Sequence, residues 1–282
     1  MTRFGAHAFI WQASWDRDAA QAAIEGAARA GLDFIEIPLL RPERFDADLT
    51  RQLLDDAGLA ATCSLGLPAD AALPDRPDQA VAFLERVLEL AHRAGATALS
   101  GVIYGTLGVT PGRPPTVDEL GTIAASLRSV AGTARTLGLK LGVEPVNRYE
   151  THLLNTAEQG LELLDAIDAP NVFLHLDTYH MNIEEKGFEG PIRAAGDRLG
   201  YIHLSESDRG TPGTGNVHWD DVFAGLANIG YDGDLVMESF VAVNPDIARA
   251  TCLWRPVAPD SDTLVREGLA FLREKARLAG IA

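Results

Sequence analysis

The chain has 282 residues, of which 46% are hydrophobic, so it is long enough for one large α/β domain or two small ones. Its 24 Lys and Arg against 40 Asp and Glu give a net charge of −16, which argues against nucleic acid and anionic membranes as partners. The two cysteines, Cys63 and Cys252, exclude a disulfide framework and indicate a reducing compartment. The sequence shows no signal peptide and no apolar stretch of about 18 residues, so we expect a soluble, cytoplasmic protein.

Eight short apolar segments bounded by Gly or Pro predict buried parallel strands. In chain order they are Phe4–Trp11, Phe34–Pro38, Ala60–Leu67, Ala98–Tyr104, Lys140–Val146, Val172–Thr178, Tyr201–Ser205 and Leu235–Phe240. Segments rich in Ala, Leu, Glu and Arg separate them. Eight strand–helix units in 282 residues predict an α/β fold, a single (β/α)8 TIM barrel over residues 1–282. A doubly wound sheet is the alternative, but GxGxxG is absent after the first strand.

The segment between the third and fourth predicted strands illustrates the helical pattern. Apolar residues recur at spacings of three and four over Gln79–Ala94, which is typical of one face of an amphipathic helix. Asp78 is the expected N-cap of this helix, and Gly95 is the expected residue just beyond its end.

A long irregular stretch, Val241–Asp262, follows the last predicted strand and contains Trp254, Arg255, Pro256 and Pro259. Loops of this length in compact domains are usually lids, binding loops or interface elements. We expect one of these roles for the stretch.

Four ionisable residues close strand-like runs in the second half of the chain, namely Glu144, Asp177, His203 and Glu238. The gaps of 33, 26 and 35 residues each match about one βα unit, and the carboxyl ends of barrel strands meet at one mouth. Each residue alone is more simply explained as a helix cap or a packed core residue. Together, three buried carboxylates would repel each other unless a cation joined them. Oxygen ligands with one imidazole favour a single divalent ion, Mn²⁺ with Co²⁺ or Mg²⁺ as alternatives.

A polar residue follows each of three of these positions at short range. Glu150 follows Glu144 by six residues, His180 follows Asp177 by three, and Arg209 follows His203 by six. Loop residues in these positions are placed to hold substrate hydroxyl groups around the ion.

Taken together, the motifs E-x5-E, D-x2-H, H-x5-R and M-E-S resemble those of the D-tagatose 3-epimerase / D-allulose (psicose) 3-epimerase family, ketose 3-epimerases among the xylose-isomerase-like barrels. The resemblance implies that Glu144, Asp177, His203 and Glu238 bind the metal, and that Glu144 and Glu238 are also the acid/base pair. It implies that the O1–O2–O3 end of the sugar is held by Glu150, His180 and Arg209. It also implies that the distal end is contacted by Trp11 and Trp15, with a pocket shaped by Cys63–Leu67.

The residue types predict a proton-transfer mechanism. One glutamate would remove the C3 proton of a ketose to give an enediolate, and the other would return a proton to the opposite face. The Gly-rich run Thr211–Gly215 contains no Lys, so it is expected to form a tight turn and the substrate to be a free sugar. The preferred ketose stays open, and the resemblance favours a homodimer or homotetramer.

Other functions remain as alternatives at this point. An aldose–ketose isomerase could use the same metal site, and the scaffold also suits a metal-dependent dehydratase or phosphodiesterase, or a sugar-binding protein without activity. His7 is expected to be a packed, hydrogen-bonded barrel residue. Glu36 ends the second predicted strand and could orient a metal ligand, pair with a basic residue or contact the substrate.

Overall fold

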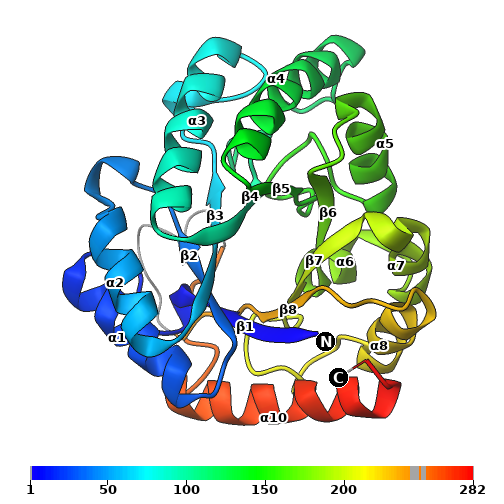
Figure 1. Ribbon diagram of the computed structural model, residues 1–282. Helices are drawn as coiled ribbons and strands as arrows, with labels where there is room; N and C mark the ends of the chain where they lie inside the picture. Colours follow the sequence, from blue (N-terminus) through cyan, green and yellow to red (C-terminus); the bar gives the residue numbers. More distant parts are fainter. Residues whose placement is uncertain (1, 242–247, 249–251, 282) are drawn as a thin grey trace.

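The computed structural model describes residues 2–241, 248 and 252–281. Its eight parallel strands form a closed barrel in sequential order, with helices around the outside (Figure 1). The strands are β1 (Arg3–His7), β2 (Phe34–Pro38), β3 (Ala60–Gly66), β4 (Ala96–Val102), β5 (Lys140–Val143), β6 (Val172–Asp177), β7 (Leu199–Leu204) and β8 (Asp234–Met237). The predicted (β/α)8 fold is confirmed.

The helices that cover the barrel are α1 (Arg17–Arg29), α2 (Ala47–Ala57), α3 (Pro77–Arg93), α4 (Val117–Thr136), α5 (Ala157–Ile167), α6 (Thr178–Glu184), α7 (Glu189–Ala195), α8 (Trp219–Asn228) and α10 (Ser261–Ala279). Short 3-10 helices occupy Ala8–Ile10, Pro42–Arg44, Ala69–Ala71 and Gly196–Arg198. The two ends of the described chain meet beside β1, where the Thr2 hydroxyl donates to the Ile281 carbonyl at 2.5 Å (Figure 1). No helix of the described part is both long and apolar enough to cross a membrane.

Element boundaries differ from the predicted ones in ways that local chemistry explains. The first strand ends at His7 rather than Trp11, because the His7 side chain caps a 3-10 helix by accepting from the Phe9 backbone N–H. Asp78 is not the N-cap of α3, so that prediction was wrong. The helix begins two residues earlier than predicted, at Pro77, whose fixed φ suits the first helical turn. Gly95 follows the end of α3 with a φ of +81°, as predicted.

Aromatic side chains fill the barrel interior toward the amino ends of the strands. Phe34, Phe173 and Tyr201 form a buried cluster there. Glycines on neighbouring strands make room for these rings, because a Cβ on Gly200 would lie 2.6 Å from Cγ of Phe173 and one on Gly5 would lie 2.4 Å from the Phe34 ring. Side chains therefore close this end of the barrel, and chemistry is left to the carboxyl ends of the strands.

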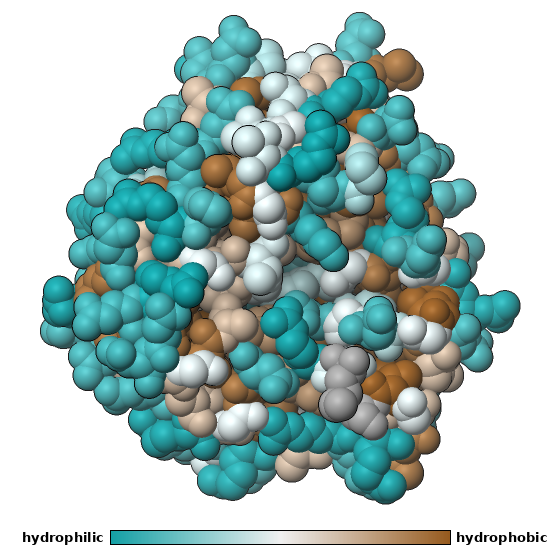
Figure 2. Space-filling view, in the orientation of Figure 1, coloured by the Kyte–Doolittle hydropathy of each residue, from teal (hydrophilic) through white to brown (hydrophobic). Residues whose placement is uncertain are grey.

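The visible surface of the molecule is largely hydrophilic (Figure 2). Figure 2 shows hydrophilic residues over most of one face, with apolar residues scattered among them. Such a surface offers no broad apolar face in this view.

We expect Gly200→Ala to lower the free energy of unfolding by about 1–3 kcal/mol, because the new methyl group would overlap the Phe173 ring in a packed interior. Urea unfolding followed by circular dichroism measures the change. The control is Gly121→Ala, whose new Cβ would meet nothing within 4 Å in the second turn of α4, so this variant should be as stable as the parent or more so. Equal stabilities of Gly200→Ala and the parent protein would contradict this account of the glycine.

Candidate active site

The four predicted ligands converge at the carboxyl ends of the last four strands. Asp177 is the last residue of β6, and His203 is the fifth residue of β7. Glu144 and Glu238 directly follow β5 and β8 rather than ending them. All four side chains are buried. Three of them, Glu144, His203 and Glu238, line one cavity of about 110 Å³ together with Glu150, His180 and Arg209.

The donor atoms at this point fit a divalent cation. One ligand atom each from Asp177, His203 and Glu238 lies within 4.8 Å of the others, and Glu144 forms similar groups with Asp177 and with His203. Nδ1 of His203 is buried without a hydrogen-bond partner among the described residues. It faces Oε1 of Glu144 at 3.8 Å and Oε2 of Glu238 at 3.6 Å. An unpaired imidazole nitrogen among carboxylates is what a cation would bind.

Electrostatics also indicate that the cluster lacks positive charge. Burial raises the pKa of Glu144 well above its ordinary value, and the neighbouring Asp177 and Glu238 add to this effect. Burial raises the pKa of Asp177 too, again with a contribution from Glu238. Burial alone would lower the pKa of His203, but the carboxylates of Glu36 and Glu238 raise it overall. A cation would therefore take the place of protons that the carboxylates and Nδ1 of His203 otherwise hold.

Arg209 is the cation that the chain itself supplies. Its guanidinium Nη1 donates to Oε2 of Glu238 and lies 3.5 Å from Oδ2 of Asp177. It also stacks over the Tyr179 ring, with 4.0 Å from Cζ to the ring centroid. Although burial raises the pKa of Glu238, Arg209 and His203 hold it well below its ordinary value. The pKa values of the two glutamates are therefore shifted in opposite directions, that of Glu144 upward and that of Glu238 downward.

The loop that carries Arg209 is organised by Glu206, which the sequence analysis did not single out. Its buried carboxylate accepts hydrogen bonds from three backbone N–H groups and from Nε1 of Trp219. The backbone donors belong to Ser207, Gly213 and Val217. The Gly-rich run Thr211–Gly215 thus wraps around a carboxylate of the chain. The sequence feature that could have identified Glu206 is an acidic residue in a loop rich in glycine.

His180 and Glu150 are held together by Asn147, which sequence reasoning also missed. The amide nitrogen of Asn147 lies 2.9 Å from Oε1 of Glu150 and 2.9 Å from Nδ1 of His180. The backbone N–H of Asn147 also donates to Nδ1 of His180 at 3.1 Å. Burial, together with Arg209, lowers the pKa of His180 well below its ordinary value, so the ring is neutral. Nδ1 accepts, so the ring hydrogen is on Nε2, which faces Asp177 at 3.6 Å.

Another buried imidazole, that of His175, lies beneath the cluster. His175 is two residues before Asp177 on β6, so its side chain points to the same face of the strand, into the barrel. Its Nδ1 lies 2.8 Å from Oγ of Ser100, and its ring contacts His203 edge-on with 4.2 Å between centroids. The alternation of side chains along β6 could have identified this residue from the sequence.

His7 and Glu36 both line the cavity from β1 and β2. Nδ1 of His7 accepts from the Phe9 backbone, and its Nε2 lies 3.3 Å from Oγ of Ser64, so the ring is packed and hydrogen-bonded as expected. Oε2 of Glu36 lies 2.7 Å from Nε2 of His203 and accepts from the Tyr201 hydroxyl at 2.8 Å. Glu36 therefore sits behind a candidate metal ligand.

The residues expected at the distal end of the sugar are only partly brought to the cavity. Trp11 lies outside it, in a hollow between α1 and α10 where a Cβ on Gly26 would meet its indole nitrogen. Trp15 donates to the Thr50 hydroxyl at 3.0 Å and lines a neighbouring hollow. Within Cys63–Leu67, the residues from Ser64 to Gly66 do line the cavity.

Apolar side chains complete the lining of the cavity. They are Phe9, Pro38, Leu40, Leu65, Val102, Leu107, Val146 and Phe240. Two of them contact ionisable residues, because Arg209 lies over the Phe240 ring and Phe9 packs against His7.

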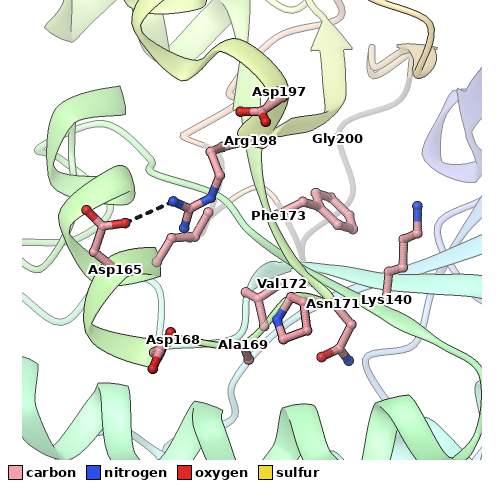
Figure 3. Close-up of a pocket in the computed structure, with 12 residues that line it drawn as sticks. Lys140, Asp165, Asp168, Ala169, Asn171, Val172, Phe173, Asp197, Arg198 and Gly200 are labelled. Carbon is pink, nitrogen blue, oxygen red and sulfur yellow. Dashed lines mark hydrogen bonds and ion pairs between the residues drawn. The ribbon is translucent and has the colours of Figure 1, made fainter.

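A hollow larger than this cavity lies at the other end of the barrel. It measures about 560 Å³ and is lined by residues around the end of α5 and the starts of β5, β6 and β7 (Figure 3). Arg198 pairs there with Asp165 at 2.9 Å, and Phe173 closes the barrel behind them. None of the predicted site residues lines this hollow.

The predicted loop Val241–Asp262 falls partly outside the described residues, which omit 242–247 and 249–251, and its last two residues belong to α10. Of the described part, Leu253 and Val257 pack against Phe240 and Phe9. Phe240 and Phe9 line the cavity, so Leu253 and Val257 support the cavity wall from behind.

Comparison with known proteins agrees with this geometry. A family model described as "Xylose isomerase-like TIM barrel" matches residues 24–275. The chain is 42% identical to an L-ribulose 3-epimerase of Methylomonas sp. (strain DH-1), over 96% of this chain and 97% of the relative. It is 39% identical to a ketose 3-epimerase of Arthrobacter globiformis, over 97% of this chain and 96% of the relative.

A solved structure resembles this one over nearly its whole length. It is the D-allulose 3-epimerase from Methylomonas sp. in complex with D-allulose, with a TM-score of 0.94 and 42% identity, covering 97% of each chain. Together with the matched barrel and the buried Glu, Asp and His cluster, these relatives place the protein among the sugar isomerases. The chain belongs to the ketose 3-epimerase family of xylose isomerase-like TIM barrels.

Proposed function

We propose that this chain inverts C3 of a free ketose with Glu144 and Glu238 as the acid/base pair. The observation that carries the proposal is that two buried glutamates, three strands apart around the closed barrel, both face Nδ1 of His203. Carboxylates that approach one point from different strands can reach the two faces of a flat intermediate. Inversion needs both faces, whereas proton transfer between C1 and C2 in an aldose–ketose isomerase needs one.

The cation would be held by Glu144, Asp177, His203 and Glu238, and Mn²⁺ is the proposed ion, with Co²⁺ or Mg²⁺ as alternatives. When bound, it would act as a Lewis acid that stabilises negative charge on the C2 and C3 oxygens. His203 and Asp177 would mainly bind it, since neither is proposed to move a proton. The donor set of carboxylate oxygens and one imidazole supports this assignment.

The proton steps belong to the two glutamates. One carboxylate takes the proton from C3 and leaves an enediolate on the sugar, and the other carboxyl group gives a proton to the opposite face of C3. Reversal of their roles runs the reaction backward. In the absence of a cation, Arg209 favours the ionised form of Glu238 and burial favours the protonated form of Glu144, so the surroundings of the two carboxyl groups differ.

Three further residues would hold the reactive end of the sugar. Glu150 accepts hydrogen bonds, the Nε2 hydrogen of His180 can be donated, and Arg209 supplies a positive charge next to both. We propose that they bind O1, O2 and O3. Trp11 is left out of this set, because it lies outside the cavity.

The substrate is proposed to be a ketose without a phosphate group. Arg209 is the one Lys or Arg among the described residues that line the cavity, and it already contacts Glu238 and Asp177. The apolar residues that line the cavity offer no cation to a phosphate. A homodimer or homotetramer in the cytoplasm is proposed from the family resemblance and the low cysteine content.

Chelation should abolish turnover, because it would remove the cation that balances the buried carboxylates and stabilises negative charge on the sugar oxygens. We expect EDTA to remove activity toward a panel of free ketoses, and Mn²⁺ or Co²⁺ to restore it. Chromatography for C3 epimers gives the measurement, and NMR of the product separates epimers from aldoses. Activity that is indifferent to the chelator would sink the metal-assisted scheme.

Glu238→Gln should lower kcat by at least about 10², because an amide cannot accept the proton from C3. Glu144→Gln should show a loss of similar size. The matched control is Glu162→Gln, which makes the same chemical change on the exposed face of α5 and should keep parental rates. Near-parental turnover in both site variants, with circular dichroism unchanged, would exclude the two-glutamate scheme.

Asn147→Ala should lower kcat/KM by about tenfold, because one or two hydrogen bonds that hold Glu150 and His180 would be lost at about 1 kcal/mol each. The Mn²⁺ affinity should stay unchanged, since Asn147 contacts none of the four proposed ligands. Asn228→Ala removes an exposed side-chain hydrogen bond to Glu189 and serves as the control. A parental kcat/KM for Asn147→Ala would show that Glu150 and His180 need no such support.

A further inference from the structure

Glu36 is a buried carboxylate that the proposed reaction does not use. It is the middle residue of β2, 1% exposed, and contacts His203 at the ring nitrogen that does not face Glu144 and Glu238. Its Oε2 is 2.7 Å from Nε2 of His203, whereas Nδ1 of the same ring faces Glu144 and Glu238. The imidazole thus bridges Glu36 on one edge and the candidate cation site on the other.

This contact settles which ring nitrogen can bind an ion. An ionised carboxylate only accepts hydrogen bonds, so the hydrogen between Glu36 and His203 belongs to Nε2 of the imidazole. An imidazole that donates from Nε2 keeps a lone pair for a cation on Nδ1. Nδ1 is also the buried nitrogen that no described residue satisfies. The geometry therefore presents the binding nitrogen to the three carboxylates.

Glu36 is itself held by Tyr201. The Tyr201 hydroxyl lies 2.8 Å from Oε2 of Glu36 and 2.7 Å from Oγ1 of Thr62. If the Thr62 hydroxyl donates to Tyr201, and Tyr201 donates to Glu36, the two hydrogen bonds support each other. Oε1 of Glu36 lies 3.6 Å from Nε2 of His7 and has no hydrogen-bond partner among the described residues. Strand register explains the arrangement, because Glu36 is aligned with Thr62 on β3 and with His7 on β1.

Tyr201 comes from the same strand as the ligand that it helps to hold. It lies two residues before His203 on β7, so both side chains point into the barrel. Its ring belongs to the aromatic cluster that fills the other end of the barrel. The position of Glu36 is thereby tied to the packed interior, and side-chain rotation there is restricted.

We propose that Glu36 is a positioning residue that fixes the ring of His203 for metal binding, that Tyr201 and Thr62 fix Glu36, and that Glu36 does not contact the sugar. The inference rests on the metal site of the proposed function. It chooses one of three roles that the sequence left open for this residue.

The test is the Mn²⁺ affinity of metal-stripped protein, measured by calorimetry and by the electron paramagnetic resonance signal of free Mn²⁺. We expect Glu36→Gln to weaken Mn²⁺ binding about 10- to 100-fold, as is typical when the group behind a histidine ligand is changed. KM for the ketose, measured at saturating Mn²⁺, should stay within about twofold of the parent. Asp165→Asn is the matched control, because it also converts a carboxylate to an amide but at the opposite end of the barrel.

A double-mutant cycle distinguishes positioning from a separate contribution. His203→Ala should weaken Mn²⁺ binding strongly, and adding Glu36→Gln to it should weaken binding by less than about twofold more, since Glu36 acts through the ring that is gone. Tyr201→Phe removes a hydrogen bond to Glu36 and should lower the affinity in the same direction by a smaller factor. This variant also serves if Glu36→Gln does not fold.

Two results would overturn the proposal. Parental Mn²⁺ affinity in Glu36→Gln with a raised KM would assign Glu36 to the sugar. Full additivity of Glu36→Gln and His203→Ala would show that Glu36 does not act through the imidazole. Failure of the proposed function looks different, because then the parent protein itself would bind no Mn²⁺ and would keep its activity in EDTA.

Discussion

Burial of several carboxyl groups at one point is the constraint on which the rest of the structure depends. Glu144, Asp177 and Glu238 lie within reach of one imidazole at the barrel mouth, and burial raises the pKa of the first two. Such a cluster costs several kcal/mol per ion unless positive charge balances it. The chain supplies one balancing charge, Arg209, and its donor atoms suit a divalent cation as the other. Residues that do not touch the cluster serve to keep these groups in place.

That support comes from two sides of the barrel. Below the cluster, aromatic rings fill the interior, and glycines on adjacent strands make room for them, so Tyr201 and His175 stand on a rigid base. Beside it, Glu206 binds the backbone of the loop that presents Arg209. The site is therefore carried by strands and by a loop that is closed around its own carboxylate, and little reorganisation is left for the moment of reaction.

Sequence periodicity was sufficient to predict the eight-stranded barrel and the convergence of Glu144, Asp177, His203 and Glu238, because the ends of parallel strands must meet at one mouth. It failed where a contact depends on residues far apart in the chain. Glu206 and Asn147 look like ordinary loop residues until the fold brings their partners to them. Trp11 was expected at the cavity because it ends the first predicted strand. In the structure it follows a 3-10 helix and lies between α1 and α10, outside the cavity. His175 could have been predicted from the sequence, because the alternation of side chains along β6 places it on the same face of the strand as Asp177.

The ionisable and apolar residues that line the cavity come mostly from different parts of the barrel. Most ionisable groups lie on β5 to β8 and the loops after them, whereas Pro38, Leu40, Leu65 and Leu107 lie on β2 to β4 and the loops after them. Substitutions in the first half of the chain can therefore reshape the apolar lining without replacing any of the four proposed metal ligands.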